Sequence, residues 1–179
     1  MILPTFRYHP DPLASGSIVA AGGSCAVCRQ RRGYLYTGPI YGEGDDISDI
    51  CPWCIADGSA HAKLDVTFVD DEALAADISA AIEVEITCRT PGFASWQSEQ
   101  WPCCCDDAAA FLKPVGIAEI RRDHYEWEGL LMGHIVQSMR LSGGAARRLL
   151  ESLDKESGPT AYAFQCLHCH RLHFYIDQL

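Results

Sequence analysis

Six of the ten cysteines in this chain lie in three Cys-x-x-Cys pairs. The first two pairs, Cys25–Cys28 and Cys51–Cys54, are separated only by residues 29–50. Two thiolates at this spacing approach one ion from a tight turn, and a second such pair completes the tetrahedron of ligands that zinc prefers. The spacing therefore predicts a structural zinc site with Cys25, Cys28, Cys51 and Cys54 as ligands.

The third pair, Cys166–Cys169, is half of a metal site and needs further ligands from elsewhere in the chain. The run Cys103–Cys105 is the best source, because three adjacent thiols otherwise need another explanation. We predict a second structural zinc held by Cys104, Cys105, Cys166 and Cys169, with His168 and His170 as competing fourth ligands. The alternative is that Cys103–Cys105 packs as small hydrophobic residues, as we expect for Cys88.

Two kinds of catalysis compete with structural zinc. The sequence Cys-Pro-Trp-Cys at Cys51–Cys54 has the form of a thiol-disulfide oxidoreductase site, in which a helix N-terminus lowers the pKa of the first thiol. The preceding residues, EGDDISDI, are not the apolar strand that such a site follows. A catalytic zinc is disfavoured because the sequence contains no HExxH, and no P-loop, dinucleotide fingerprint or GxSxG is present. We therefore expect that this protein is not an enzyme.

The elements that must position these cysteines are partly visible in the pattern. Residues 1–20 contain three prolines and predict an extended lead-in, and Gly33–Gly42 (GYLYTGPIYG) predicts a β-hairpin. Pro52 suits the first turn of a helix that begins after Cys51. The order of turn, hairpin and helix is typical of a treble-clef zinc finger, here over residues 20–66.

The rest of the chain alternates between clear and ambiguous segments. Apolar residues at helical spacing predict a helix that is capped by Asp70 or Asp71 and ends at Thr90. Residues 92–116 are expected to be irregular or helical in short pieces, and residues 117–141 are ambiguous. A helix is expected over residues 145–155, followed by two short strands around Cys166 and Cys169. The predicted class is α+β: one domain over residues 1–179, with a treble-clef-like finger, a helical middle and a C-terminal zinc ribbon that forms the second zinc subsite (residues 100–179).

Charge and length restrict the function further. The chain has 179 residues and a net charge of −10, and twelve of its 24 acidic residues lie between Glu43 and Glu85, where Lys63 is the only basic residue. Such a segment repels nucleic-acid phosphates and attracts basic partners, although acidic runs often serve only for solvation. No apolar run is long enough for a membrane helix and the first residues do not form a secretory signal, so we expect a soluble, cytoplasmic protein without direct nucleic-acid binding.

Five sequence blocks in order resemble the CbrC family, a group of bacterial cytoplasmic proteins associated with tolerance to a DNase colicin. The blocks are LPTFRYHPDPLASGSI, GYLYTGPIYG, CPWCIADGSA, RTPGFASWQSEQW and AYAFQCLHC, and the resemblance runs from about Leu3 to Asp177. It implies metal-binding cysteines at Cys25, Cys28, Cys51, Cys54, Cys105, Cys166 and Cys169. Cys104 stands where many members have a histidine.

The resemblance and the charge together predict a binding protein that neutralises a basic nuclease toxin. Immunity proteins typically cover the basic surface of such a toxin with acidic residues. The expected contact residues are Glu43, Asp45, Asp46, Asp49, Asp70, Asp71 and Glu72. The alternatives are a zinc-dependent regulatory or stress-response module and, less favoured, a thiol-disulfide oxidoreductase at Cys51 and Cys54.

Overall fold

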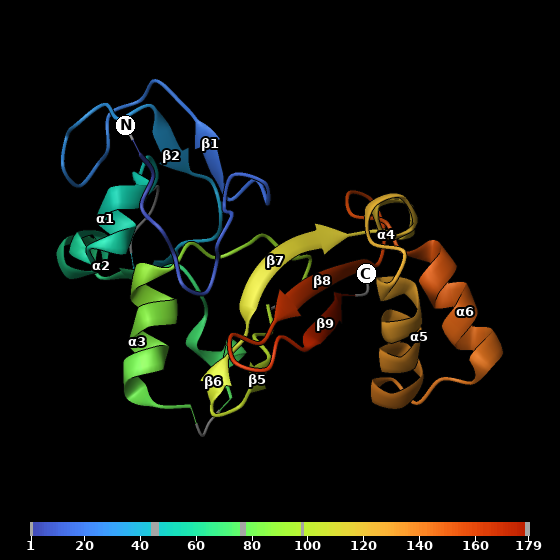
Figure 1. The fold of residues 1–179 in the computed structure, drawn as a ribbon. Coiled ribbons are helices and arrows are strands. Elements are labelled where there is room, and N and C mark those ends of the chain that lie inside the picture. The colour runs from blue at the N-terminus through green and yellow to red at the C-terminus, as the bar shows by residue number, and fades with distance from the viewer. Residues whose placement is uncertain (1, 44–46, 76–77, 98, 178–179) are drawn as a thin grey trace.

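The computed structural model describes residues 2–43, 47–75, 78–97 and 99–177. The N-terminal part, up to helix α3, forms one lobe, and a three-stranded sheet with three helices forms the other (Figure 1). The fold is a mixture of short helices and small antiparallel sheets, which agrees with the predicted α+β class.

The N-terminal lobe contains two small antiparallel pairs. Strand β1 (Ile18–Ala20) pairs with β2 (Tyr34–Tyr36), and β3 (Tyr41–Gly42) pairs with β4 (Val66–Thr67). The predicted hairpin over Gly33–Gly42 is therefore wrong, because its two strands join different sheets. The chain between them folds over the Tyr36 ring, whose hydroxyl donates to the Pro39 carbonyl at 2.7 Å, so it cannot turn straight back.

Short helices follow the second cysteine pair. Helix α1 (Pro52–Ala56) begins directly after Cys51 with proline in its first turn, as predicted. Helix α2 (Ser59–Leu64) follows a break at Gly58, whose φ of 76° is a left-handed conformation that glycine adopts at low cost. The two helices and the first strand pairs pack around the apolar core of this lobe.

The next helix begins later than its apolar spacing predicted. Asp70 caps only a 3₁₀ turn, η1 (Asp71–Ala73), by accepting from the Glu72 N–H at 3.1 Å. The longer helix α3 (Ala80–Arg89) begins at its own cap, Ser79, and ends before Thr90, so the predicted start is wrong and the predicted end is confirmed. The reason is local, because Asp70 and Ser79 can both act as N-cap residues, and each caps a separate turn.

The second lobe is built on a sheet with the order β7-β8-β9. Strands β8 (Thr160–Gln165) and β9 (Leu172–Asp177) are the two predicted C-terminal strands. Strand β7 (Ala110–Val115), which contains Pro114, lies in the segment 92–116 that the sequence predicts to be irregular or helical in short pieces, so that prediction is wrong here. It lies at the edge of the sheet, where a proline without an N–H is tolerated. A short hairpin, β5 (Cys103–Cys104) and β6 (Asp107–Ala108), precedes it.

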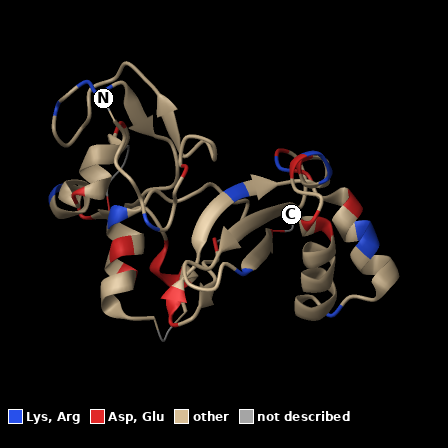
Figure 2. Ribbon diagram, in the orientation of Figure 1, with Lys and Arg blue, Asp and Glu red and all other residues tan. Residues whose placement is uncertain are grey.

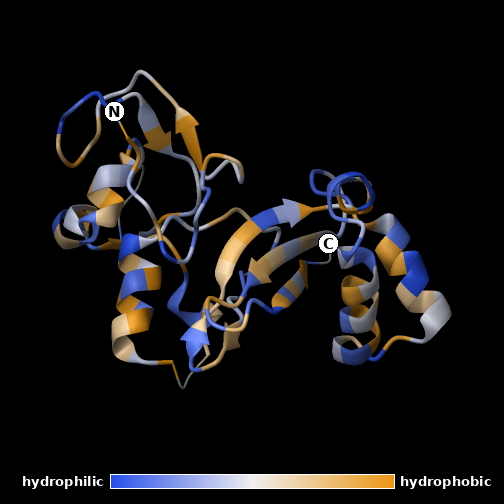
Figure 3. Cartoon of the chain, in the orientation of Figure 1, coloured by the Kyte–Doolittle hydropathy of each residue, from blue (hydrophilic) through white to orange (hydrophobic). Residues whose placement is uncertain are grey.

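Three helices cover one face of this sheet. They are α4 (Ile117–Asp123), α5 (Trp127–Ser138) and α6 (Gly143–Ser152), so the ambiguous residues 117–141 are mainly helical. Their apolar sides meet Ala161, Ala163 and Phe174 in one buried cluster, and hydrophobic and hydrophilic residues alternate along α5 and α6 (Figure 3). In the described part of the chain, no helix has the length and apolar character needed to cross a membrane.

The opposite face of the sheet packs on Tyr8, Val69 and Ile86 of the N-terminal lobe and on a cluster of aromatic residues. Phe93 stacks on Phe111 with ring centroids 4.1 Å apart and also contacts Trp101, Tyr162 and Phe164. Gly92 lies beside this cluster, and a Cβ atom there would come within 2.0 Å of the Phe68 carbonyl oxygen. The sheet is therefore buried on both faces, which fixes the hairpins that carry the second group of cysteines.

Candidate metal centres

The structure brings Cys25, Cys28, Cys51 and Cys54 together in the N-terminal lobe. The Sγ atoms of Cys25 and Cys54 are 3.8 Å apart, as are those of Cys28 and Cys51, and all four lie within 4.8 Å of one another. Four sulfurs at a zinc–sulfur distance of about 2.3 Å lie about 3.8 Å apart in a regular tetrahedron. These four thiols can therefore hold a metal ion of the size and coordination of zinc.

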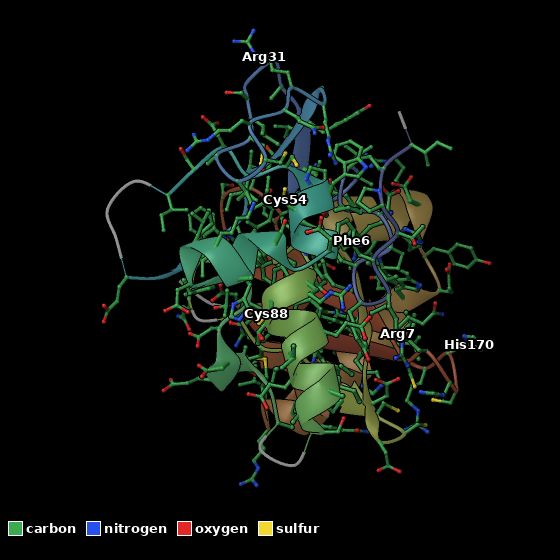
Figure 4. All side chains as sticks on the ribbon, turned by 90° about the vertical axis from the view of Figure 1, so that its left-hand side faces the viewer. Phe6, Arg7, Arg31, Cys54, Cys88 and His170 are labelled. Carbon is green, nitrogen blue, oxygen red and sulfur yellow. The ribbon has the colours of Figure 1, made fainter. Side chains whose placement is uncertain are left out.

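A second group of four thiols joins parts of the chain about sixty residues apart. The Sγ atom of Cys104 is 3.8 Å from that of Cys105 and 3.6 Å from that of Cys169. With Cys166, these ligand atoms also lie within 4.8 Å of one another. Figure 4 shows the two groups of sulfur atoms well apart, one beside Cys54 and the other near His170. The described residues thus provide two four-cysteine groups, each able to hold one ion.

Each group of four thiols consists of two pairs of cysteines, here called half-sites. Two of the four half-sites have the same type of backbone turn. In Cys25–Cys28 the Cys25 N–H donates to the Gln30 carbonyl and the Arg29 N–H donates to the Cys25 carbonyl, both at 2.9 Å. In Cys166–Cys169 the corresponding bonds join Cys166 to Arg171 at 2.9 Å and His170 to Cys166 at 3.1 Å. The residue after each pair, Arg29 or His170, has a left-handed φ near 60°. Both turns therefore direct two thiols to the same side.

The other two half-sites differ from these turns and from each other. Cys51 is the N-cap residue of α1 and Cys54 lies in its first turn, so the positive end of a short helix faces the cluster. Cys104 ends strand β5, and Cys105 and Asp106 form the two-residue turn to β6 with φ of 57° at both positions. This is the conformation of a type I′ hairpin turn, which glycine, asparagine and aspartate favour. A cysteine at its first position has a conformational cost, which metal binding by its thiolate would offset.

Backbone N–H groups support one sulfur in each cluster. Burial raises the pKa of the Cys25 thiol, but backbone hydrogen bonds around it, including those from Val27 at 3.4 Å and Cys51 at 3.3 Å, bring the pKa down to about 7. The N–H groups of Cys169 and His168, at 3.5 Å and 3.4 Å, lower the pKa of Cys166 to about 6 against a smaller effect of burial. In each site, backbone N–H groups therefore favour the thiolate form of one cysteine, which is the form that binds a cation.

The redox alternative at Cys51 and Cys54 is not favoured by this geometry. Both side chains are buried, and burial raises the pKa of the Cys51 and Cys54 thiols instead of lowering it. A thiol-disulfide oxidoreductase needs an accessible first thiol with a depressed pKa. Cys51 and Cys54 instead face Cys28 and Cys25 across the cluster.

Neither competing histidine belongs to the second group. The His168 ring turns away from the sulfurs, and its Nε2 lies 2.8 Å from Asp107 Oδ2. His170 is exposed on the loop after Cys169 (Figure 4). The remaining cysteines lie outside the two groups: Cys88 is buried in α3, as expected of a core residue, and Cys103 is exposed on β5.

The acidic residues that were predicted to bind a partner come from two separate segments. Glu43, Asp49, Asp71 and Glu72 are exposed and Asp70 is half-buried, whereas Asp45 and Asp46 lie outside the described residues. Acidic residues lie on α3 and on the ribbon beside it, while α4 to α6 carry both signs of charge (Figure 2). The backbone carbonyl of Asp49 accepts from the Ala26 N–H at 2.9 Å, so the main chain at Asp49 also supports the first cysteine turn.

A set of buried titratable groups has no recognisable signal in the sequence. Asp107 is 4% exposed and accepts from Tyr8 and His168, and these bonds outweigh burial to keep the pKa of its carboxyl below the usual value. Glu99 is also buried, and burial raises its pKa to about 7. These residues stand singly in the sequence, so only their burial in the folded chain distinguishes them from surface acids.

Comparison with known proteins places the chain among bacterial relatives of similar length. It is 43% identical over 180 residues to UPF0167 protein Mb2317 of Mycobacterium bovis and to UPF0167 protein MT2352 of Mycobacterium tuberculosis, covering 93% of this chain and 89% of each relative. It is 42% identical over 177 residues to UPF0167 protein PA1536 of Pseudomonas aeruginosa, covering 98% of this chain and 97% of the relative. No solved structure matches the chain. The model of the uncharacterised protein family UPF0167 matches residues 3–178, and the chain therefore belongs to that family.

Proposed function

We propose that this protein is a non-catalytic, zinc-stabilised acidic binding protein of the CbrC type that acts in the cytoplasm as an immunity or tolerance protein against a nuclease toxin. The zinc sites are supported by the two four-cysteine groups, because the ligand atoms of each group lie within 4.8 Å of one another. Four thiolates leave no open position for a substrate, which is the arrangement of a structural rather than a catalytic zinc site.

The donor chemistry supports zinc as the bound ion. Tetrahedral sites with four sulfur ligands select zinc or iron, because thiolates are soft ligands. Metal analysis of protein purified without added metal tests the proposal, with two equivalents of zinc per chain as the expected result. Two equivalents of iron, with the colour of an iron–thiolate centre, would contradict it.

The partner is proposed from charge and from the resemblance. The net charge of −10, with half of the acids between Glu43 and Glu85, suits a basic protein surface such as that of a nuclease. The blocks that resemble the CbrC family add the context of colicin tolerance. Electrostatic attraction would make capture fast, which a cell needs if the toxin is to be blocked before it reaches DNA.

Charge reversal on exposed acids tests the partner surface. The variant Glu43→Lys, Asp71→Lys, Glu72→Lys is compared with a control of equal charge change on the other lobe, Asp123→Lys, Glu126→Lys, Glu156→Lys. We expect the first variant to bind a colicin-type DNase domain at least about tenfold more weakly, and with a smaller dependence on salt, than the control. Equal affinities of the two variants in calorimetry would show that the working surface lies elsewhere.

The second candidate is a zinc-dependent regulatory or stress-response module that binds another protein. It shares the scaffold and differs only in the partner. Native mass spectrometry of the gently recovered protein distinguishes the two, because the immunity hypothesis expects a basic nuclease-sized mass beside two zinc ions. A complex with a partner that has no nuclease activity would favour the second candidate.

A further inference from the structure

The two four-cysteine groups have the same ligands but very different access to solvent. In the first group Cys25, Cys51 and Cys54 are at most 2% exposed and belong to the core of the N-terminal lobe. In the second group Cys105 and Cys169 are exposed, and only Cys166 is buried. Since the donor chemistry is identical, any difference in reactivity must come from access and from the surroundings of each sulfur.

A cavity of about 420 Å³ opens onto the second group. It is lined by Cys104 and Cys105, together with Cys103, Ser79 and Asp106. A small polar reagent can therefore approach two of the four ligands from outside.

Backbone hydrogen bonds add to this difference within the second group. Among the described residues, the N–H groups of His168 and Cys169 donate to sulfur in this group, and both donate to the buried Cys166 Sγ. A thiolate that accepts N–H bonds is a weaker nucleophile, because part of its charge is already stabilised. The exposed sulfur of Cys169 therefore keeps more of its reactivity, and that of Cys104 lies 3.6 Å away.

We propose, on the basis of the zinc content proposed above, that the second group is an oxidation site for hydrogen peroxide, and that the first group keeps its metal under the same conditions. The Cys169 thiolate attacks one peroxide oxygen, which gives a sulfenic acid and releases hydroxide. The Cys104 thiolate then attacks the Cys169 sulfur, a disulfide forms, and a second hydroxide leaves. Two thiolates lose two electrons and the peroxide gains them, so Cys104 and Cys169 would no longer be available as ligands and a zinc ion held by the group would lose two of its four sulfurs.

Loss of this ion would affect only part of the fold. The Cys105–Asp106 turn and the Cys166–Cys169 turn would lose their common ligand, while the first group, in the other lobe, would still hold α1 to the turn at Cys25. Reduction by a thiol compound in the presence of zinc would restore the site. The second group would thus report peroxide without unfolding the whole chain.

The experiment uses the full chain with its zinc content measured first by native mass spectrometry. Hydrogen peroxide is added, and released zinc is followed with a chromogenic chelator while peptide mapping locates disulfides. We expect one equivalent of zinc to leave at least about tenfold faster than the other, with a disulfide between Cys104 and Cys169. Two zinc ions that leave at one common rate, or a fast phase with disulfides among Cys25, Cys28, Cys51 and Cys54, would overturn the proposal.

Two variants locate the fast phase. Cys103→Ser changes an exposed thiol beside the site and should keep the fast release, whereas Cys169→Ser should begin with one zinc and show only the slow phase. A fast phase that survives in Cys169→Ser would contradict the assignment. A native chain that holds no zinc before oxidation would refute the zinc proposal itself, whereas two zinc ions with equal release rates refute only the oxidation site.

Discussion

His168 and Asp107 connect the two halves of the second cysteine group, with Nε2 of the histidine 2.8 Å from Oδ2 of the aspartate. Asp107 follows Cys104 and Cys105 in the β5–β6 hairpin, and His168 lies between Cys166 and Cys169. The same carboxylate accepts from the Tyr8 hydroxyl at 2.7 Å and pairs with Arg7. A buried carboxylate thus links the N-terminal segment to both turns of the site, and such outer contacts orient metal ligands.

Replacement of Asp107 by asparagine should weaken the second metal site alone. Asp107→Asn keeps the shape of the side chain but removes the charge that His168 and Arg7 face, so the two turns are held less firmly. We expect the dissociation constant of one zinc ion to rise about tenfold to a hundredfold, while the other is unchanged. Competition with a chelator measures both. The control is Asp106→Asn, an exposed neighbour in the same turn, and an equal effect of the two variants would refute the role of Asp107.

Loss of one ligand from each group should have unequal effects on stability. Cys51→Ser removes a ligand that lies inside an apolar core, so we expect the loss of one zinc ion and a large fall in melting temperature, because metal binding there is coupled to folding. Cys169→Ser should also remove one zinc ion but lower the melting temperature less, because its turn is exposed. Metal analysis and calorimetry measure the two effects. Unchanged zinc content in Cys51→Ser would show that the first group is not a metal site.

His9 should make the native state less stable in mild acid. Its ring is fully buried between the Pro91 carbonyl and Ser15, and burial lowers its pKa from 6.5 to about 4. Between these values the unfolded chain binds a proton that the native chain does not. Stability is therefore fully present above pH 6.5 and falls by about 2 kcal/mol on acidification to pH 5. Urea unfolding of the native chain and of His9→Gln isolates this effect, and parallel pH profiles of the two proteins would contradict it.

Glu99 should act in the opposite direction. Burial raises its pKa from 4.5 to about 7, and one of its oxygens has no hydrogen-bond partner among the described residues, so the protonated form is favoured in the native state. The native chain then binds a proton that the unfolded chain releases, and stability falls as the pH rises from 4.5 to 7. Between pH 4.5 and pH 8, the free energy of unfolding of Glu99→Gln should rise by about 3 kcal/mol relative to that of the unsubstituted protein. The exposed control Glu72→Gln should show no such rise in urea unfolding. If Glu99→Gln shows none either, the prediction is refuted.

The short-range features of the metal sites could be predicted from the sequence. The Cys-x-x-Cys spacing identifies the turns at Cys25 and Cys166, and Pro52 marks the start of α1, because these features depend on neighbouring residues. The C-terminal strands were equally clear, since their apolar runs are bounded by turn residues. The sequence indicates Cys104 and Cys105 as ligands only because the pair Cys166–Cys169 needs partners and adjacent thiols need an explanation, since they form no ligand pattern of their own.

The pairing of distant segments was decided only by the tertiary structure. The strands of the Gly33–Gly42 segment pair with β1 and β4 instead of with each other, because the chain folds over the Tyr36 ring before it can turn back. The first cysteine group is buried in the core of the N-terminal lobe, whereas two ligands of the second group lie on exposed turns. The burial of Asp107 beside Tyr8 likewise depends on residues far away in the sequence. The spacing of the cysteines does not indicate that difference, because burial depends on contacts far along the chain.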